Sequence, residues 1–303
     1  MVPTGVQLIK NFLLVCFFTV CSCSAENNAS TPSFNNGKAF DYLSRQVSFG
    51  PRIPGTKAHT ETADWIISVL REQTSNVSFQ PFTGISDGAE KDMKNIMASF
   101  YPEKSNRILL CAHWDCRPHA DRDPDLSKQK DPVPGANDGA SGVAVLMVIA
   151  EIIANAEPLM GVDIVLFDGE DGGDYGNNDS WLLGSRHFAK TMPAGYKPEY
   201  AILLDMIGDR DLSLSREYYS VNSAPLLWGK IVMHCETIGI PISGETIGVL
   251  DDHVPLIDRG IKAVDLIDFD YPSWHTVSDT PDKCSPESLG KIGELLLKLM
   301  YEE

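Results

Sequence analysis

The stretch Asp163-Ile-Val-Leu-Phe-Asp-Gly-Glu-Asp171 decides the fold of this chain. Its apolar residues 164–167 predict a buried β-strand, and Glu170 and Asp171 follow where that strand gives way to a loop. Two adjacent carboxylates repel each other, and burying either one is costly unless a proton or a metal compensates the charge. Alone, the pair is typical of a solvated loop end. Only its surroundings can give it a more specific meaning.

Strand-like and helix-like segments alternate on both sides of this stretch. The expected strands cover residues 95–101, 107–112, 164–167, 201–204 and 263–267, and the expected helices cover residues 39–47, 60–73, 142–154, 182–190, 226–238 and 286–300. This alternation predicts one α/β domain, a three-layer α/β/α sandwich around a mostly parallel, twisted mixed sheet. The long loop 115–137 is rich in Pro, Asp and Arg and offers little to bury, so we expect it to be functional or disordered.

The composition excludes some classes of partner. Acidic residues outnumber basic ones by 42 to 25 among the 303 residues, and the net charge is −17 at pH 7. This charge argues against nucleic acid or an anionic membrane surface as the main partner. No internal repeat or linker divides the chain, and a monomer is the default expectation for its oligomeric state.

The N-terminus predicts an export signal over residues 1–25. Lys10 precedes the apolar residues 12–20, a run too short to span a bilayer. The residues around Cys23 resemble a lipoprotein signal, so we expect a periplasmic protein or a lipoprotein whose only membrane contact is its lipid anchor. Cleavage near Ala25 and secretion are the alternative. Residues 26–37 predict a flexible tether, and residues 38–303 a single folded domain.

Four cysteines remain after removal of the signal. An oxidising compartment would permit disulfides among them, with three full pairings, and the sequence does not select one. They are Cys111, Cys116, Cys235 and Cys284.

Carboxylates or imidazoles follow each expected strand from residue 107 onward and precede the helix at residue 142. Sheets with parallel strands bind ligands beyond the carboxyl ends of those strands. The residues concerned are His113 and Asp115, Asp138, Glu170 and Asp171, Asp205, and His275. Each has a plain alternative: Asp138 could cap a helix, for example, and His113 could be an ordinary core histidine. Loop composition explains one or two such placements but not all five.

Histidine and carboxylate ligands without thiolates suit a catalytic zinc, which keeps one coordination position open. Asp138, Asp171 and His275 would form such a set. His113 and Asp205 would add a second metal, with Asp138 bridging the two ions. The sequence therefore predicts one zinc and does not exclude a second ion.

Six motifs follow one another in a fixed order. They are His113-Trp-Asp115, Gly135-Ala-Asn-Asp-Gly-Ala-Ser-Gly142, Asp168-Gly-Glu-Asp171, Leu204-Asp-Met-Ile-Gly208, Asp251-Asp-His-Val-Pro255 and Trp274-His-Thr276. Together they resemble the M28-type zinc peptidase clan and, within it, the glutaminyl-peptide cyclotransferases, above all the bacterial ones. The first motifs are shared with aminopeptidases of the clan, whereas the last two are more specific to the cyclases. The resemblance runs from about residue 38 to the end and implies a zinc aminopeptidase-like fold.

The resemblance also implies a reaction and a set of roles. The reaction is cyclisation of the N-terminal glutamine of peptides or proteins to pyroglutamate, with release of ammonia. The implied roles are zinc ligands for Asp138, Asp171 and His275, acid/base carboxylate for Glu170, supporting acids near the leaving group for Asp205 and Asp251, and an indole flanking the substrate for Trp274.

Two positions depart from the animal cyclases, and alternatives stay open. Asp171 stands where those enzymes have Glu, and Asp265 where they carry His, so their hydrogen-bond network is expected to be altered here. The main alternative is a two-zinc aminopeptidase in which Glu170 activates a water molecule. A secreted binding protein that has lost its metal is the non-enzymatic alternative.

Overall fold

The computed structural model describes Met1 and residues 31–302, and residues from Thr31 onward form one compact unit. The expected export signal and Cys23 lie outside the described residues. Helix α1 (Asn36–Ser48) includes the last two residues of the expected tether, since the Asn35 side chain accepts a hydrogen bond from the Lys38 backbone N–H and so caps the helix.

A six-stranded sheet forms the centre of this unit, with strand order β1-β2-β4-β3-β5-β8. The pairs β1–β2 and β2–β4 are antiparallel, and the three remaining pairs are parallel. The strands are β1 (Val77–Ser86), β2 (Ala89–Phe100), β3 (Arg107–His113), β4 (Gly161–Phe167), β5 (Ala201–Asp205) and β8 (Ala263–Ile267). A separate parallel pair consists of β6 (Leu214–Glu217) and β7 (Ile242–Ile247). The predicted mixed, mostly parallel sheet is confirmed.

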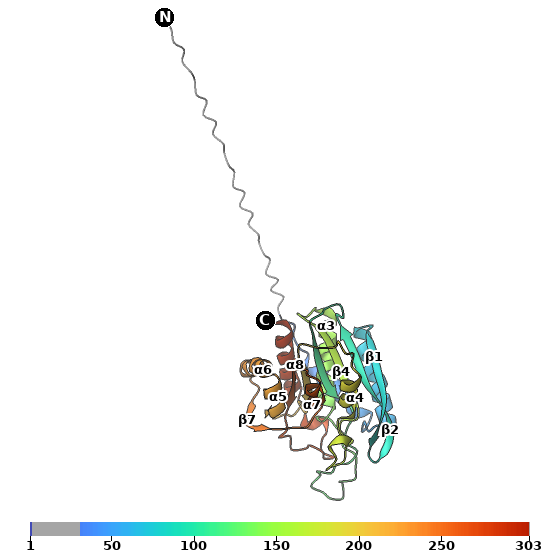
Figure 1. The fold of residues 1–303 in the computed structure, drawn as a ribbon. Coiled ribbons are helices and arrows are strands. Elements are labelled where there is room, and N and C mark those ends of the chain that lie inside the picture. Colours follow the sequence, from blue (N-terminus) through green and yellow to red (C-terminus); the bar gives the residue numbers. More distant parts are fainter. Residues whose placement is uncertain (2–30, 303) are drawn as a thin grey trace. The chain divides into compact units, whose positions relative to one another are not determined.

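Helices cover both faces of the sheet, as Figure 1 shows. The first face carries α1, α2 (Lys57–Gln73), α3 (Ala140–Asn155), α6 (Pro225–Ile238) and α8 (Pro286–Tyr301). The second face carries α4 (Leu183–Thr191) and α7 (His253–Asp258), and α5 (Tyr218–Ser223) packs beside β8. The expected three-layer α/β/α architecture is therefore confirmed.

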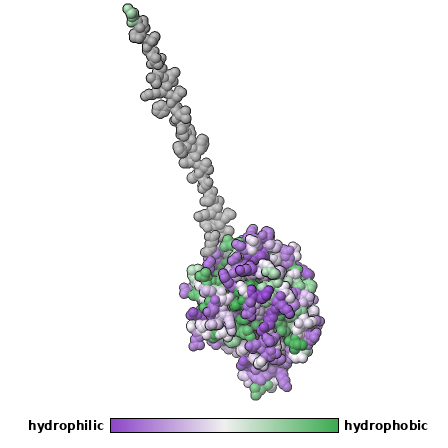
Figure 2. Space-filling model, in the orientation of Figure 1, coloured by the Kyte–Doolittle hydropathy of each residue, from purple (hydrophilic) through white to green (hydrophobic). Residues whose placement is uncertain are grey.

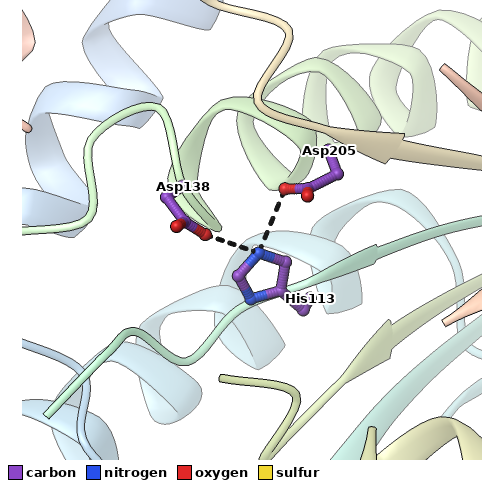
Figure 3. A group of neighbouring side chains, drawn as sticks. All are labelled: His113, Asp138 and Asp205. Carbon is purple, nitrogen blue, oxygen red and sulfur yellow. Dashed lines mark hydrogen bonds and ion pairs between the residues drawn. The ribbon is translucent and has the colours of Figure 1, made fainter. Parts of the chain in front are cut away.

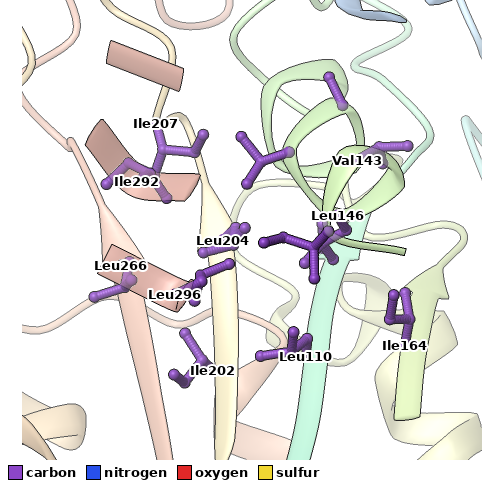
Figure 4. Close-up of a cluster of buried hydrophobic side chains, with 14 of the residues drawn as sticks. Leu110, Val143, Leu146, Ile164, Ile202, Leu204, Ile207, Leu266, Ile292 and Leu296 are labelled. Atoms are coloured by element: carbon purple, nitrogen blue, oxygen red, sulfur yellow. The ribbon is translucent and has the colours of Figure 1, made fainter. Parts of the chain in front are cut away.

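Strand β3 shows why the central strands are almost continuously apolar. Leu110 belongs to the core beneath α3 and α8, whereas Leu109 and Cys111 belong to the core beneath α4 and α7. Successive side chains of a strand point to opposite faces, and both faces of this strand are covered. Figure 4 shows the larger core, to which Leu110 of β3 and Leu146 of α3 both belong.

Several elements were not predicted from the sequence. Strand β1 is a sheet edge with exposed residues along most of its length and contains Pro81 and Gly84, so it lacks an apolar run. It pairs with β2 along its whole length, and this pairing cannot be predicted from its composition. The other unpredicted elements are the short segments β6, β7, α5 and α7.

The expectation that loop 115–137 has little to bury is wrong. Cys116, Arg117, Asp123 and Val133 are all buried within it. The fully buried Arg52 donates hydrogen bonds to the carbonyl oxygens of residues 114, 134 and 135, and thereby ties both ends of the loop together. Buried polar groups are tolerated where they are paired in this way.

No disulfide joins the four cysteines that follow the expected signal, and all four are buried thiols: Cys111, Cys116, Cys235 and Cys284. Among the described residues, no helix has both the length and the apolar character to cross a membrane. The face in Figure 2 shows hydrophilic side chains with small apolar areas between them.

Candidate metal and active site

The carboxyl ends of the parallel strands meet at a pocket of about 260 Å³. All seven residues with a predicted role line it, although they come from five separate segments of the chain. They are Asp138, Glu170, Asp171, Asp205, Asp251, Trp274 and His275. Aromatic and aliphatic side chains, among them Tyr175, Ile267 and Phe269, complete the wall.

Asp138 stands at the centre of this arrangement. Its Oδ1 lies 3.1 Å from His113 Nε2, and its Oδ2 lies 3.5 Å from His275 Nε2. The N-cap of α3 is Gly139, and Asp138 makes no capping hydrogen bond, so the helix-cap alternative is wrong. Gly139 has φ 91°, and a Cβ there would lie 2.5 Å from the Asp115 carbonyl oxygen, so this turn requires glycine.

His275 occupies a strained backbone conformation, with φ 54°. Its Nδ1 lies 3.2 Å from the Tyr175 hydroxyl and 3.5 Å from Asp121 Oδ1, which fix the orientation of the ring. Its Nε2 therefore faces Asp171 Oδ1, at 3.1 Å. Metal-binding histidines are usually oriented through their second nitrogen in this manner.

Two further carboxylates hold the backbone that carries the ligands. Asp115 accepts hydrogen bonds from the backbone N–H groups of Glu170 and Asp171, at 3.1 and 3.2 Å. Asp279 accepts from those of Asn137 and Asp138, at 2.8 and 3.1 Å. The strand-end pattern identified Asp115 but missed Asp279, since nothing local in the sequence distinguishes that residue.

Burial shifts the titration of two acids that line the pocket. It raises the pKa of Glu170 well above the ordinary value; the charges of Asp171 and Asp251 add to this effect, and that of His113 opposes it. Burial likewise raises the pKa of Asp205 to about 7 against the hydrogen bond from His113. Burial therefore favours the protonated form of both carboxyls.

The group Asp138, Asp171 and His275 fits a metal ion. Each residue offers a ligand atom within 4.8 Å of the others. Neither carboxylate oxygen of the buried Asp171 has a hydrogen-bond partner among the described residues. Tetrahedral zinc would separate its N and O ligands by about 3.4 Å, close to the 3.1 and 3.5 Å found from His275 Nε2. A cation would compensate the buried charge of Asp171, whose pKa burial raises.

The group His113, Asp138 and Asp205 has similar spacing but different hydrogen bonding (Figure 3). His113 Nε2 lies 3.2 Å from Asp205 Oδ1, in a hydrogen bond of ordinary length. Burial lowers the pKa of His113, but hydrogen bonds with the surrounding carboxylates raise it well above its usual range. The carboxylates around His275 raise its pKa as well, so this shift does not distinguish the two groups.

A third cluster surrounds Asp265. Burial and the charge of Asp251 raise the pKa of Asp265 well above its usual value, and neither of its carboxylate oxygens has a hydrogen-bond partner among the described residues. His253 lies on the far side, with its Nδ1 3.9 Å from Asp265 Oδ2 and its Nε2 3.1 Å from Glu217 Oε2.

The pattern of this chain matches that of known enzymes. The family model for peptidase family M28 matches residues 95–300. A glutaminyl cyclase structure from Tannerella forsythia is 38% identical, with 90% of this chain and all of that chain covered and a TM-score of 0.85. A leucine aminopeptidase precursor from Bacteroides thetaiotaomicron is 34% identical, with coverages of 90% and 99% and a TM-score of 0.87.

A Zn-dependent exopeptidase from Parabacteroides distasonis is also similar, at 35% identity, coverages of 90% and 100% and a TM-score of 0.86. These similarities extend over the whole described unit, including the strands that deliver the pocket residues. The chain therefore belongs to peptidase family M28, with the fold of the zinc aminopeptidases and a candidate zinc site of aspartate and histidine ligands.

Proposed function

We propose that this protein is a zinc-dependent glutaminyl cyclase that converts the N-terminal glutamine of peptides or proteins to pyroglutamate and releases ammonia. The observation that carries the proposal is the difference between the two ligand groups around Asp138. The unpaired oxygens of Asp171 favour one cation there, whereas His113 Nε2 and Asp205 Oδ1 lie within hydrogen-bond distance of each other. A single zinc beside an acid/base carboxylate suits an intramolecular transfer, because no second ion is needed to hold a water nucleophile.

The similarity to the Tannerella forsythia cyclase supports the same proposal. The pocket is also small, with a volume of about 260 Å³, and one side is formed by the rings of Trp274 and Phe269, whose centroids lie 5.1 Å apart. A site of this size suits one terminal residue with a short side chain.

The pocket residues would divide the work. Asp138, Asp171 and His275 would hold zinc, which when bound supplies Lewis-acid polarisation of a carbonyl oxygen. Glu170 would take a proton from the substrate α-amine, whose nitrogen bonds to the γ-carbonyl carbon. The same carboxyl would return the proton to the amide nitrogen as its bond to that carbon breaks and ammonia leaves.

The other residues would orient the substrate. Asp205 and Asp251 line the pocket with Glu170, and the charge of Asp251 raises the pKa of Glu170. Trp274 would form an apolar wall for the glutamine side chain. Holding the amine and the amide of one residue in a single pocket lowers the entropic cost of bringing them together.

The test offers two substrates to the zinc-loaded protein, a peptide with N-terminal glutamine and a leucine anilide. Ammonia release from the first, without liberated amino acid from either, is expected. The Glu170→Gln variant should lose about 10²–10⁴-fold in rate, while Glu236→Gln on the exposed surface of α6 serves as the control.

One observation favours a second candidate, a two-zinc aminopeptidase: the ligand atoms of His113, Asp138 and Asp205 also lie within 4.8 Å of one another. In that enzyme Glu170 would activate water. Release of leucine from the anilide without ammonia from the glutamine peptide would replace the cyclase proposal by this one.

A further inference from the structure

Three consecutive residues of loop 115–137 hold the loop that carries Trp274 and His275. Asp121 Oδ1 lies 3.5 Å from His275 Nδ1, and the Arg122 backbone N–H donates to the His275 carbonyl oxygen at 3.1 Å. Asp123 Oδ2 accepts a hydrogen bond from the Val277 backbone N–H at 3.1 Å. The backbone of Arg122 is therefore fixed beside the pocket.

The guanidinium of Arg122 lies over two aromatic rings of the pocket wall. Its Cζ is 5.2 Å from the ring centroid of Tyr175 and 5.2 Å from that of Trp274. Both distances lie within the range of cation–π contacts. Arg122 is exposed, as is 54% of Tyr175, so this cation stands where the pocket opens to solvent.

Arg117 gives a direct comparison, because it lies over the same Tyr175 ring, at 5.1 Å. Its N–H groups are committed: they donate to Asp121 at 2.5 Å and to the carbonyl oxygens of Asp171 and Gly173 at 2.9 Å. The Arg122 guanidinium makes no hydrogen bond or ion pair with any residue that the structure describes. Its donors are thus available to a ligand.

The adjacent carboxylate of Asp121 does not neutralise Arg122, because it is engaged with Arg117 and His275. Arg122 therefore places a positive charge beside the pocket in a chain of net charge −17.

We propose that Arg122 is a specificity-determining residue that binds a carboxylate on the side chain of the second residue of the substrate. The proposal rests on the proposed function, which puts the N-terminal residue in the pocket beside Trp274. A chain advances about 3.5 Å per residue, so the second side chain leaves the pocket at its mouth. A guanidinium offers carboxylates two parallel N–H donors, and its fixed stacking lowers the cost of ordering it.

The test measures kcat/KM for three capped peptides that differ only at their second residue: Gln-Glu, Gln-Gln and Gln-Lys amides. For the zinc-loaded wild type we expect the rank order Glu, Gln, Lys, with a Glu-to-Lys ratio of about threefold to fivefold, the size of an exposed ion pair. High salt should reduce the ratio, because it screens exposed charges.

Variants of Arg122 then test whether this residue causes the preference for Glu. Arg122→Gln should bring the Glu-to-Lys ratio close to one. Arg122→Lys should retain part of the preference, because lysine keeps the positive charge but lacks the two parallel N–H donors of the guanidinium. Arg71→Gln, an exposed arginine of α2, is the matched control and should keep the wild-type ratio.

Two outcomes would overturn the proposal: an unchanged ratio in Arg122→Gln, or equal loss on all three peptides, which would make Arg122 only a support for the aromatic wall. The role of Arg122 can still be tested if the cyclase proposal fails. If no glutamine peptide is cyclised, the ratio measured by leucine release from Leu-Glu and Leu-Lys amides decides the role of Arg122 by itself.

Discussion

The two ligand groups that share Asp138 contain the same kinds of side chain at nearly the same spacing, yet their hydrogen bonds differ. In the first group, His113 lies at 3.1 and 3.2 Å from carboxylate oxygens and forms a hydrogen bond with Asp205. In the second, both oxygens of Asp171 lack a partner within the described part of the chain. The types and spacing of the side chains alone therefore do not define a metal site. The two groups differ in whether these ligand atoms already have hydrogen-bond partners.

The largest expected effect is that of Asp171→Asn. The amide loses the charge that the ion would compensate, so zinc affinity should fall more than about 100-fold, beyond the loss seen for residues that only orient a ligand. Metal content after dialysis and glutamine-peptide turnover measure it. The exposed Asp211→Asn is the control, and full zinc retention in Asp171→Asn would contradict the assignment.

A second carboxylate–imidazole pair, Glu217 with His253, provides a reference in which both carboxylate oxygens accept hydrogen bonds. Burial alone would raise the pKa of Glu217, but hydrogen bonds from His253 and from the backbone N–H groups of Ser220 and Tyr219 outweigh this effect and lower the pKa to about 2 from an ordinary 4.5. The contribution of the ionised Glu217 to the stability of the fold is thus present above pH 4.5 and is lost as the pH falls through 2.

Glu217→Gln should accordingly lower the free energy of unfolding by at most about 3 kcal/mol at pH 7. The difference from wild type should shrink as the pH is lowered from 4.5 towards 2. Urea unfolding at several pH values measures this, with the exposed Glu294→Gln of α8 as the control. A difference in the free energy of unfolding that stays constant down to pH 2 would show that these hydrogen bonds do not lower the pKa of Glu217.

Replacing His113 by Ala should have a smaller effect on zinc. His113 would orient Asp138 without binding the ion, and such residues contribute about tenfold to 100-fold in metal affinity. His113→Gln, which keeps an N–H donor, should recover part of the loss. The number of zinc ions per chain should stay at one in both variants, and a fall from two to one would support the two-zinc alternative.

The smallest expected effect is that of Tyr175→Phe. It removes the hydroxyl that lies 3.2 Å from His275 Nδ1 and keeps the ring. One hydrogen bond contributes about 0.5–1.5 kcal/mol, which predicts roughly a twofold to tenfold loss in zinc affinity by competition with a chelator. Tyr218→Phe, at an exposed tyrosine of α5, should change nothing.

The sheet and the pocket residues could be predicted from the sequence for one physical reason. Strands buried on both faces are apolar runs, so the polar residue that ends each run stands out, as His113 and Asp205 do. Edge strand β1 gave no such signal, because one side of it faces solvent and a Pro and a Gly interrupt it.

Two residues that act through hydrogen bonds with the backbone could not be predicted from the sequence. Asp279 and Arg52 hold segments that lie far away in the chain, and their local sequences resemble ordinary loops. The raised pKa of Asp265 likewise depends on burial and on Asp251, which comes close only in the folded protein.

The most direct test of the one-zinc assignment is a titration of zinc into metal-free protein, with cyclisation of a glutamine peptide followed at each step. The unpaired oxygens of Asp171 and the hydrogen-bonded His113 group predict that activity rises linearly and saturates at one zinc per chain. Saturation at two zinc ions per chain would contradict the account.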